Sequence, residues 1–375
     1  MSFDRSLLSE KLKKYREQFR LTISELSQLT GIKDSFLQAY ENQEKIPTGD
    51  EILILADYYL CDYKFFISNE RVAPFEQTET LFRRHGNIFS KEDRRAIQEF
   101  LFLAECESFL IQQLGKKQRE FVFSKPTNNH KKNGIAAANA LRKEIGYTDN
   151  EVRLNIYDDF RKIGIHTFRR QLNNSDISGL YIKHPVAGKC ILINYDEDIY
   201  RQRFTAAHEA AHAILEDDKD GVIVSLKGDQ EYVEIGANNF ASHYLMPPKF
   251  LGSIPNWDEE KALEWANKLK VSTEALAYAL SGAKLIDNVT QFRIKSVRVA
   301  KEQKVDPELP DNLSPRSLER KQTLLKKGLS DFYVNLCIEG YKRDVISLAR
   351  MAEMLLVDEL ELFEILSLFN ERICL

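Results

Sequence analysis

Apolar residues recur every three or four positions along most of the chain, and this spacing predicts a mainly helical protein. Near the N-terminus, Thr22-Ile-Ser-Glu25 has the form of a helix-capping box, and Gly31 provides the turn after the helix that it opens. Residues 4–67 therefore predict five short helices. Three side chains of the third helix, over residues 33–42, are expected to face its core: Phe36, Leu37 and Tyr40.

A change from helical spacing to alternation predicts a small sheet in the middle of the chain. The β-branched, alternating segments are Ile165–Arg169, Gly179–Lys183 and Lys189–Tyr195, so we expect a mainly α fold with a small sheet, class α+β. Helical spacing returns on both sides of these strands. Further helices are predicted at residues 90–114, 135–145, 154–163, 257–269, 272–280, 318–329, 332–341, 347–355 and 358–369.

Two breaker segments indicate how the chain divides into domains. Residues 115–133 are polar and rich in Asn and Lys, and residues 303–315 are rich in proline. We predict four parts: a five-helix domain at 1–70, a helical connector and linker at 71–133, a domain with the sheet at 134–287, and a C-terminal helical domain at 288–375.

Composition and charge limit the class of protein. Of the 375 residues, 43% are hydrophobic and 29% charged, which is ordinary for a globular chain of several domains. The formal net charge of −4 argues against general attraction to nucleic acid or an anionic membrane. The first residues lack a signal-peptide layout and no apolar run approaches ~20 residues, so we expect a soluble, cytoplasmic protein without a membrane partner. Five scattered cysteines predict reduced thiols.

The strongest candidate for chemistry is His208-Glu209-x-x-His212, inside an Ala-rich helical segment. Residues four apart lie on one face of a helix, so both imidazoles can bind the same metal ion. Glu209 lies beside the first ligand, where its carboxylate can act as the catalytic base toward a water on the metal. A helix with two structural histidines is the alternative interpretation.

A downstream helical segment supplies the candidate third ligand, Glu234. Small residues such as Ala237 lie close to it in angle and let the two helices approach each other. Two histidines and one glutamate are typical of a catalytic zinc site, although the set also accepts Mn²⁺. Asn238, one turn from Glu234, is expected to contact a ligand or the substrate. Glu231 is the competing ligand, whereas His243 lies on the opposite side of the helix.

These motifs resemble the ImmA/IrrE family of bacterial zinc peptidases. The resemblance is carried by Arg203-Phe-Thr-x-Ala-His-Glu-x-x-His and by Glu234-x-x-Ala-Asn-x-Phe-Ala-x-x-Leu-Met-Pro. Ala211 stands where the family usually has Gly, and we expect tighter packing there without loss of the site. The resemblance implies a zincin-like peptidase domain with a narrow protein substrate. Such a substrate is typically a transcriptional repressor, or an antitoxin of a toxin–antitoxin pair, cleaved under stress or phage-related signals.

The N-terminal helices resemble helix-turn-helix domains of the phage-repressor (XRE) type. Ile23-Ser-Glu-Leu26, Gly31-Ile32 and Tyr40-Glu41-Asn42 carry this resemblance. It implies that residues 33–41 form the recognition helix that binds operator DNA. Its exposed polar side chains are the candidates for contact with base edges: Lys33, Asp34, Ser35 and Gln38.

Two features of residues 1–70 argue against DNA binding. The segment holds nine basic and twelve acidic residues, whereas a DNA-binding domain normally has a basic surface. Gln43 also occupies a position where these domains usually have a glycine with positive φ. A domain that contacts another protein and a structural cap therefore stay open as alternatives.

The best-supported interpretation is a regulatory zinc metalloendopeptidase that cleaves one protein partner and also carries a DNA- or partner-binding domain. Its alternative is a DNA-binding regulator or antitoxin that cleaves nothing and has a structural or little-used zinc site. The long helix at residues 90–114 is expected to be a connector or a dimerisation helix, so a homodimer stays open.

Overall fold

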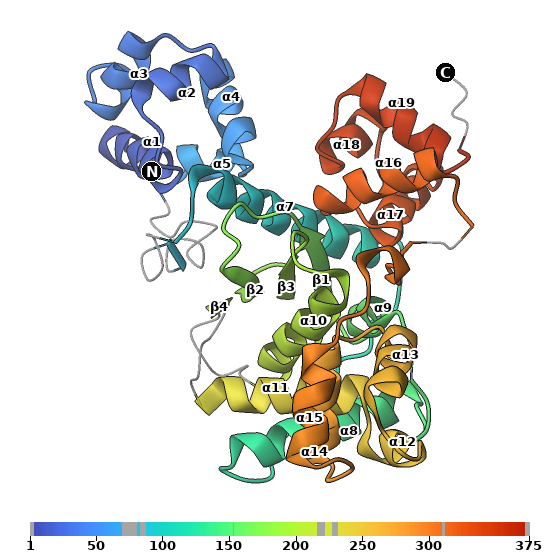
Figure 1. Ribbon diagram of the computed structural model, residues 1–375. Coiled ribbons are helices and arrows are strands. Elements are labelled where there is room, and N and C mark those ends of the chain that lie inside the picture. The colour runs from blue at the N-terminus through green and yellow to red at the C-terminus, as the bar shows by residue number, and fades with distance from the viewer. Residues whose placement is uncertain are drawn as a thin grey trace. The chain divides into compact units, whose positions relative to one another are not determined.

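The structure is a computed structural model that describes residues 4–69, 81–82, 88–152, 154–215, 222–226, 232–309 and 312–371 (Figure 1). It is mainly helical with one small mixed sheet, which confirms the predicted class. The chain divides into two compact units, residues 1–103 with 172–174 and residues 104–171 with 175–375. Among the described residues, no helix is long and apolar enough to cross a lipid bilayer.

The first unit contains the five predicted short helices. They are α1 (Arg5–Gln18), α2 (Ile23–Thr30), α3 (Asp34–Glu41), α4 (Gly49–Tyr59) and α5 (Tyr63–Ile67). The capping box of α2 is confirmed, because Thr22 and Glu25 each accept a hydrogen bond from the other's backbone N–H. Gly31 ends α2 with a φ of 73°, in the left-handed conformation that glycine adopts without a steric cost.

The core of this unit is aromatic. The ring of Tyr15 lies within 5.3–5.6 Å of the rings of Tyr59, Phe65 and Phe66, measured between centroids. A partly buried ion pair also joins α1 to α3, since Arg16 Nε and Nη2 donate to the two carboxylate oxygens of Glu41 at 2.6 and 2.8 Å. Two parallel hydrogen bonds fix the angle between these helices more firmly than a single one would.

One predicted core residue of α3 lies outside the core. Leu37 and Tyr40 are buried as predicted, but Phe36 is 36% exposed. Its ring instead lies under the Lys45 ammonium, 3.4 Å from the ring centroid, which is an attractive cation–π contact at the surface. Gln43 does adopt a positive φ, 66°, and its side-chain amide donates to the Ser6 hydroxyl at 3.2 Å.

The second unit is built on a four-stranded sheet in the order β1-β3-β2-β4. The strands are β1 (Ile165–Arg170), β2 (Ile177–His184), β3 (Gly188–Asn194) and β4 (Val222–Leu226). β1 pairs with β3 in parallel, whereas β2 is antiparallel to both β3 and β4. The three predicted strands are confirmed. β4 was not predicted, although Val222-Ile-Val has the β-branched composition of a strand.

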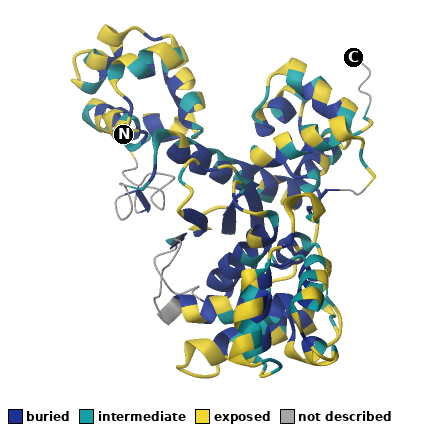
Figure 2. Cartoon of the chain, viewed as in Figure 1, coloured by how far each residue is buried: buried dark blue, intermediate teal, exposed yellow. Residues whose placement is uncertain are grey.

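Three helices position the centre of this unit. α10 (Ile199–Leu215) packs against β2 and β3, and α11 (Tyr232–Leu245) packs against α10 and α8 (His130–Ile145). Figure 2 shows α10 and the sheet as almost wholly buried. α8 and α11 approach so closely that a Cβ on Gly134 would collide with the Gly236 carbonyl group. Glycine at both positions therefore permits the contact.

Helices on either side complete the two units. In addition to α7 (Lys91–Gln113), which follows the confirmed cap at Ser90, they are α9 (Ile156–Lys162), α12 (Pro248–Gly252), α13 (Glu259–Leu269), α14 (Thr273–Gly282), α15 (Asn288–Ser296), α16 (Pro315–Lys326), α17 (Asp331–Lys342), α18 (Leu348–Met354) and α19 (Glu359–Leu368). The predicted linker is shorter than expected. Asn129 caps α8, so residues 130–133 are already helical.

The segment between α15 and α16 is fastened to the sheet unit by buried ion pairs. Arg169 donates to Asp306 at 2.8 and 3.0 Å and to Glu308 at 2.8 Å. Arg161 donates to the other oxygen of Glu308, also at 2.8 Å. Asp306 and Glu308, in the proline-rich part of the sequence, are thus held by Arg169 of β1 and Arg161 of α9.

Candidate metal centre

One face of α10 carries the polar residues of the candidate site. Arg201, Thr205, His208 and His212 follow the spacing i, i+4, i+7 and i+11, which places them along a single stripe of an α-helix. The other faces of α10 include five buried alanines, which let the helix pack closely against the sheet and α11. The sequence thus fixes the direction in which the two imidazoles point.

The structure brings His208, His212 and Glu234 together, with their ligand atoms within 4.8 Å of one another. The Glu234 carboxylate lies 2.7 Å from His208 Nε2 and 3.3 Å from His212 Nε2. The two imidazole Nε2 atoms are 3.1 Å apart. All three side chains are buried.

These distances fit a tetrahedral metal ion. Ligand atoms about 2.0–2.1 Å from Zn²⁺ at tetrahedral angles lie roughly 3.3 Å from one another, close to the observed separations. The donor set also fits, since two imidazoles and one carboxylate leave a fourth position for water or substrate. Among the described residues, this is the one group of three or more His, Cys, Asp or Glu side chains whose ligand atoms lie close enough together to hold a metal ion.

Asn238 orients the first histidine. Its side-chain oxygen lies 3.1 Å from His208 Nδ1. If Nδ1 carries the proton, Nε2 has a free lone pair that faces His212 and Glu234, which is the tautomer that a metal ligand needs. Burial by itself lowers the pKa of His208, but the contacts with Glu234, Glu209 and Asn238 outweigh burial and raise it above its ordinary value.

Glu234 is held in its charged form. Burial by itself would raise the pKa of this carboxyl group, but the hydrogen bonds and charges of His208 and His212 lower it well below its usual range. An ionised carboxylate between two imidazoles is a good ligand for a divalent cation.

Glu209 lies next to this cluster without being part of it. It is fully buried, and among the described residues neither of its oxygens has a hydrogen-bond partner of ordinary geometry. Burial raises its pKa to about 8, against smaller lowering effects of His208 and the nearby Ser225 hydroxyl. A carboxyl group with a pKa near neutrality is suited to accept and return a proton.

Gly179 on β2 provides the space that Glu209 occupies. A Cβ at this position would lie 2.9 Å from Glu209 Oε1, from the Leu192 carbonyl oxygen and from Thr205 Cγ2. No side chain fits there without displacing the carboxylate or the neighbouring strand. The Ser178-Gly179 pair of β2 thus forms the wall opposite α10.

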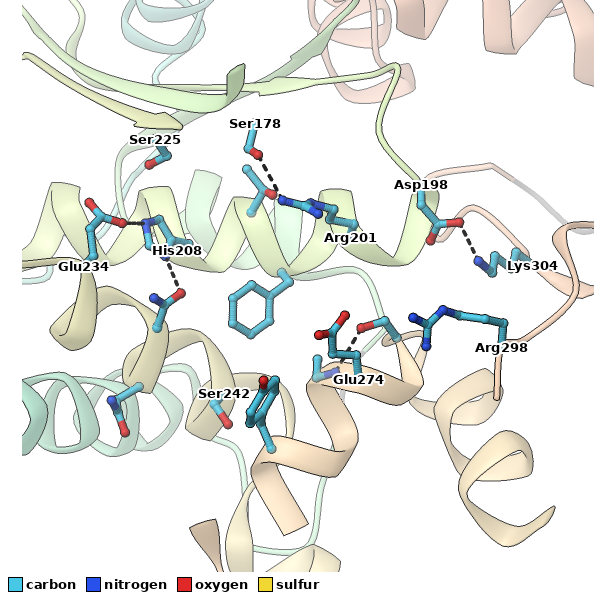
Figure 3. A pocket seen from close by; sticks show the side chains of 17 residues that line it. Ser178, Asp198, Arg201, His208, Ser225, Glu234, Ser242, Glu274, Arg298 and Lys304 are labelled. Atoms are coloured by element: carbon cyan, nitrogen blue, oxygen red, sulfur yellow. Dashed lines mark hydrogen bonds and ion pairs between the residues drawn. The ribbon is translucent and has the colours of Figure 1, made fainter. Parts of the chain in front are cut away.

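A cavity of about 730 Å³ opens beside the cluster (Figure 3). His208 and Glu234 lie at one part of it, and Arg201 and Asp198 line it further along α10. Its volume lies within the range of about 300–1,000 Å³ that is usual for ligand-binding pockets. The polar lining includes Ser178, Thr205, Ser225, Asn238, Ser242, Glu274, Arg298 and Lys304.

The other predicted site residues have definite positions in the structure. Lys33, Asp34, Ser35 and Gln38 are all exposed on or just before α3, as base-contacting side chains must be. Glu231, the competing ligand, lies outside the described residues. His243 lies outside the cluster, with its Nδ1 2.9 Å from the Asn239 carbonyl oxygen.

Sequence reasoning missed several residues around the cavity. Arg201 and Thr205 could have been found, because they precede His208 by seven and three positions and so share its face. Gly179 and Ser225 gave no such signal, since their role depends on strand pairing with distant segments. Glu197 also went unnoticed, although it contacts three residues of the cavity wall.

A helix with His-Glu-x-x-His against a small sheet, completed by a glutamate from a second helix, is the arrangement of a metallopeptidase domain. Comparison with known families agrees, since residues 160–281 match the model of the IrrE N-terminal-like domain, a peptidase family. Residues 12–66 match the model of the helix-turn-helix domain. The chain thus joins a helix-turn-helix domain to an ImmA/IrrE-like peptidase domain. No curated protein matches its sequence.

Proposed function

We propose that the chain is a zinc-dependent endopeptidase that cleaves a specific protein partner. The observation that carries this proposal is the cluster of His208, His212 and Glu234 with the buried carboxyl group of Glu209 beside it. His208, His212 and Glu234 would hold the ion. A divalent cation in such a site lowers the pKa of water and polarises a carbonyl group.

The chain's own residues would supply the proton transfers. Glu209 takes the proton of the attacking water and returns it to the leaving amine. Its buried position beside Gly179 keeps the carboxyl group in one orientation. Asn238 keeps the His208 ring in place through the contact at Nδ1. The cavity along α10 would bind the substrate segment in an extended conformation.

The substrate class follows from the resemblance to ImmA/IrrE peptidases, and we propose a transcriptional repressor or an antitoxin. The test is a comparison of protein N-termini in cells that produce the wild type or Glu209→Gln. One or a few new N-termini are expected with the wild type alone, while metal content stays equal. Identical sets of N-termini in both cultures would contradict the proposal.

A second candidate function is regulation by DNA binding without proteolysis. It is favoured by the intact helix-turn-helix domain, on which all four predicted base-contacting side chains are exposed. Under this alternative, the regulatory effect of the protein in cells is retained in Glu209→Gln but lost in Gln38→Ala. Under the peptidase proposal, the regulatory effect in cells depends on Glu209. Gln38→Ala then changes this effect only if the first unit has to bind DNA or a protein partner.

A further inference from the structure

Glu197 is a buried carboxyl group that the proposed proton transfers do not use. It lies in the turn between β3 and α10, and its side chain is 2% exposed. Two hydroxyl groups donate hydrogen bonds to it, Ser178 Oγ at 2.9 Å and Thr205 Oγ1 at 3.0 Å, and Arg201 forms an ion pair with it through Nε at 2.9 Å. Burying a carboxylate costs free energy that such hydrogen bonds offset.

All three of these side chains line the cavity. Each hydroxyl group has one hydrogen, and Ser178 uses its hydrogen for Glu197, so its oxygen faces other partners as an acceptor. Arg201 uses Nε, and its two Nη groups remain as donors on a side chain that is 49% exposed. One Nη group makes only a long contact, 3.5 Å, with Ser178 Oγ. The cavity wall thus presents a donor and an acceptor side by side.

This pair of groups matches the main chain of a peptide better than an acidic side chain. The charge of Arg201 is already balanced by Glu197, and the charges of Asp198 and Lys304, which also line the cavity, balance each other at 2.5 Å. An anion would gain little there. A neutral peptide unit offers a C=O for the Arg201 Nη groups and an N–H for Ser178 Oγ, so both would be satisfied.

The position along α10 sets the distance to the metal ligands. Arg201 precedes His208 by seven residues, which at 1.5 Å per residue is about 10 Å along the helix axis. An extended peptide advances about 3.3 Å per residue. A peptide unit at Arg201 is therefore roughly three residues from a carbonyl group at the metal ligands.

We propose that Glu197 is a positioning residue, which holds Arg201 and Ser178 as an anchor for the substrate main chain about three residues from the scissile bond. This inference rests on the proposed peptidase function. According to this proposal, this part of the cavity selects a substrate by the conformation and length of the substrate's main chain instead of by the charge of its side chains.

The test measures binding of hydroxamates, which chelate zinc, to the zinc-loaded full chain by isothermal titration calorimetry. The probes are acetohydroxamate and two series in which one to four alanines extend the hydroxamate from either side. In one series, affinity is expected to rise roughly tenfold at the third or fourth alanine, because two peptide hydrogen bonds are gained there. If affinity shows no such rise in either series, the proposed anchor is refuted.

Variants locate the step. Glu197→Gln, whose amide has one acceptor oxygen, and Arg201→Gln should both lose it yet bind acetohydroxamate like the wild type. Glu197→Asp should restore part of the step, and Arg293→Gln, an arginine of similar exposure away from the cavity, should keep all of it. A retained step in folded Glu197→Gln and Arg201→Gln overturns the proposal. Failure of the wild type to bind acetohydroxamate contradicts the metal site itself, and the anchor with it.

Discussion

The Glu209 carboxyl group lies where a side chain at position 179 would have to go, since a Cβ on Gly179 would lie 2.9 Å from Glu209 Oε1. The carboxyl group has no hydrogen bond of ordinary geometry within the described residues, and its orientation is set by packing against β2. Such a group is sensitive to small changes of shape, because protein interiors are close-packed.

Gly179→Ala is therefore expected to displace the Glu209 carboxyl group, although the substitution adds only a methyl group and no charge. The added Cβ must displace Glu209, Thr205 or the Leu192 backbone, at a cost of about 1–3 kcal/mol of stability. We expect the rate of substrate cleavage to fall at least tenfold. Zinc should still bind, as metal analysis would show, and thermal denaturation would measure the loss of stability. The control is Gly282→Ala at the end of α14, where the Cβ meets no atom within 4 Å. Equal behaviour of the two variants would contradict this account.

At this scale the sequence predicted what helical geometry determines. His208, His212 and Glu234 were identified because positions along a helix fix the direction of each side chain, and the structure brings the three together. Gly179 and Glu197 could not be identified, because their partners are brought near by strand pairing and by a turn. Phe36 was placed wrongly, since spacing alone does not reveal that Lys45 covers its ring.

Whole elements hold the ligands at their separation. Glu234 belongs to α11, and the position of α11 is fixed by its close crossing with α8 at Gly134 and Gly236. The sequence predicted that α11 approaches α10 through small residues, and Ala237 and Ala241 are indeed buried there. The approach of α8 was not predictable, because no local pattern links two helices about one hundred residues apart.

The segment after α15 should be an element whose attachment depends on pH. Burial alone would raise the pKa of Glu308, but Arg161 and Arg169 lower it below its ordinary value. A carboxylate with a lowered pKa in the folded state stabilises the fold above about pH 4.5, and this contribution is lost as pH falls through the lowered pKa. The ion pairs should therefore weaken only in strong acid.

Glu308→Gln should destabilise the second unit by about 3–5 kcal/mol at pH 7, because it leaves two buried guanidinium groups with too few partners. The difference from the wild type should shrink as pH falls below 4.5, the ordinary pKa of a glutamate, and disappear once pH has passed the lowered pKa of Glu308. Urea denaturation at several pH values measures both. Glu302→Gln, an exposed residue of the same segment, should change stability by less than about 0.5 kcal/mol. A pH-independent difference would refute this explanation.

The whole molecule consists of two compact units, and the candidate metal centre lies entirely in the second. A ligand that binds only the folded form of one unit stabilises that unit by mass action, by about 2.7 kcal/mol at one hundred times Kd. Metal binding should therefore stabilise the second unit, which contains the site. The other unit has its own aromatic core around Tyr15.

Scanning calorimetry should therefore show two transitions, only one of which responds to metal. Removing zinc with a chelator should lower the transition of the second unit by roughly 5–10 °C. Leu12→Ala, in the core of the first unit, should lower only the other transition, because it leaves a buried cavity there. A single transition that shifts under both treatments would show that the units unfold together.

The most direct test of the account is the metal content of the purified chain, measured by mass spectrometry for the wild type, His212→Ala, Glu234→Ala and His243→Ala. About one zinc per chain is predicted for the wild type and for His243→Ala, whose imidazole lies on α11 outside the cluster. Less than about a tenth of that is predicted for the other two variants. Full zinc in Glu234→Ala, or no zinc in the wild type after reconstitution, would contradict the proposed metal centre.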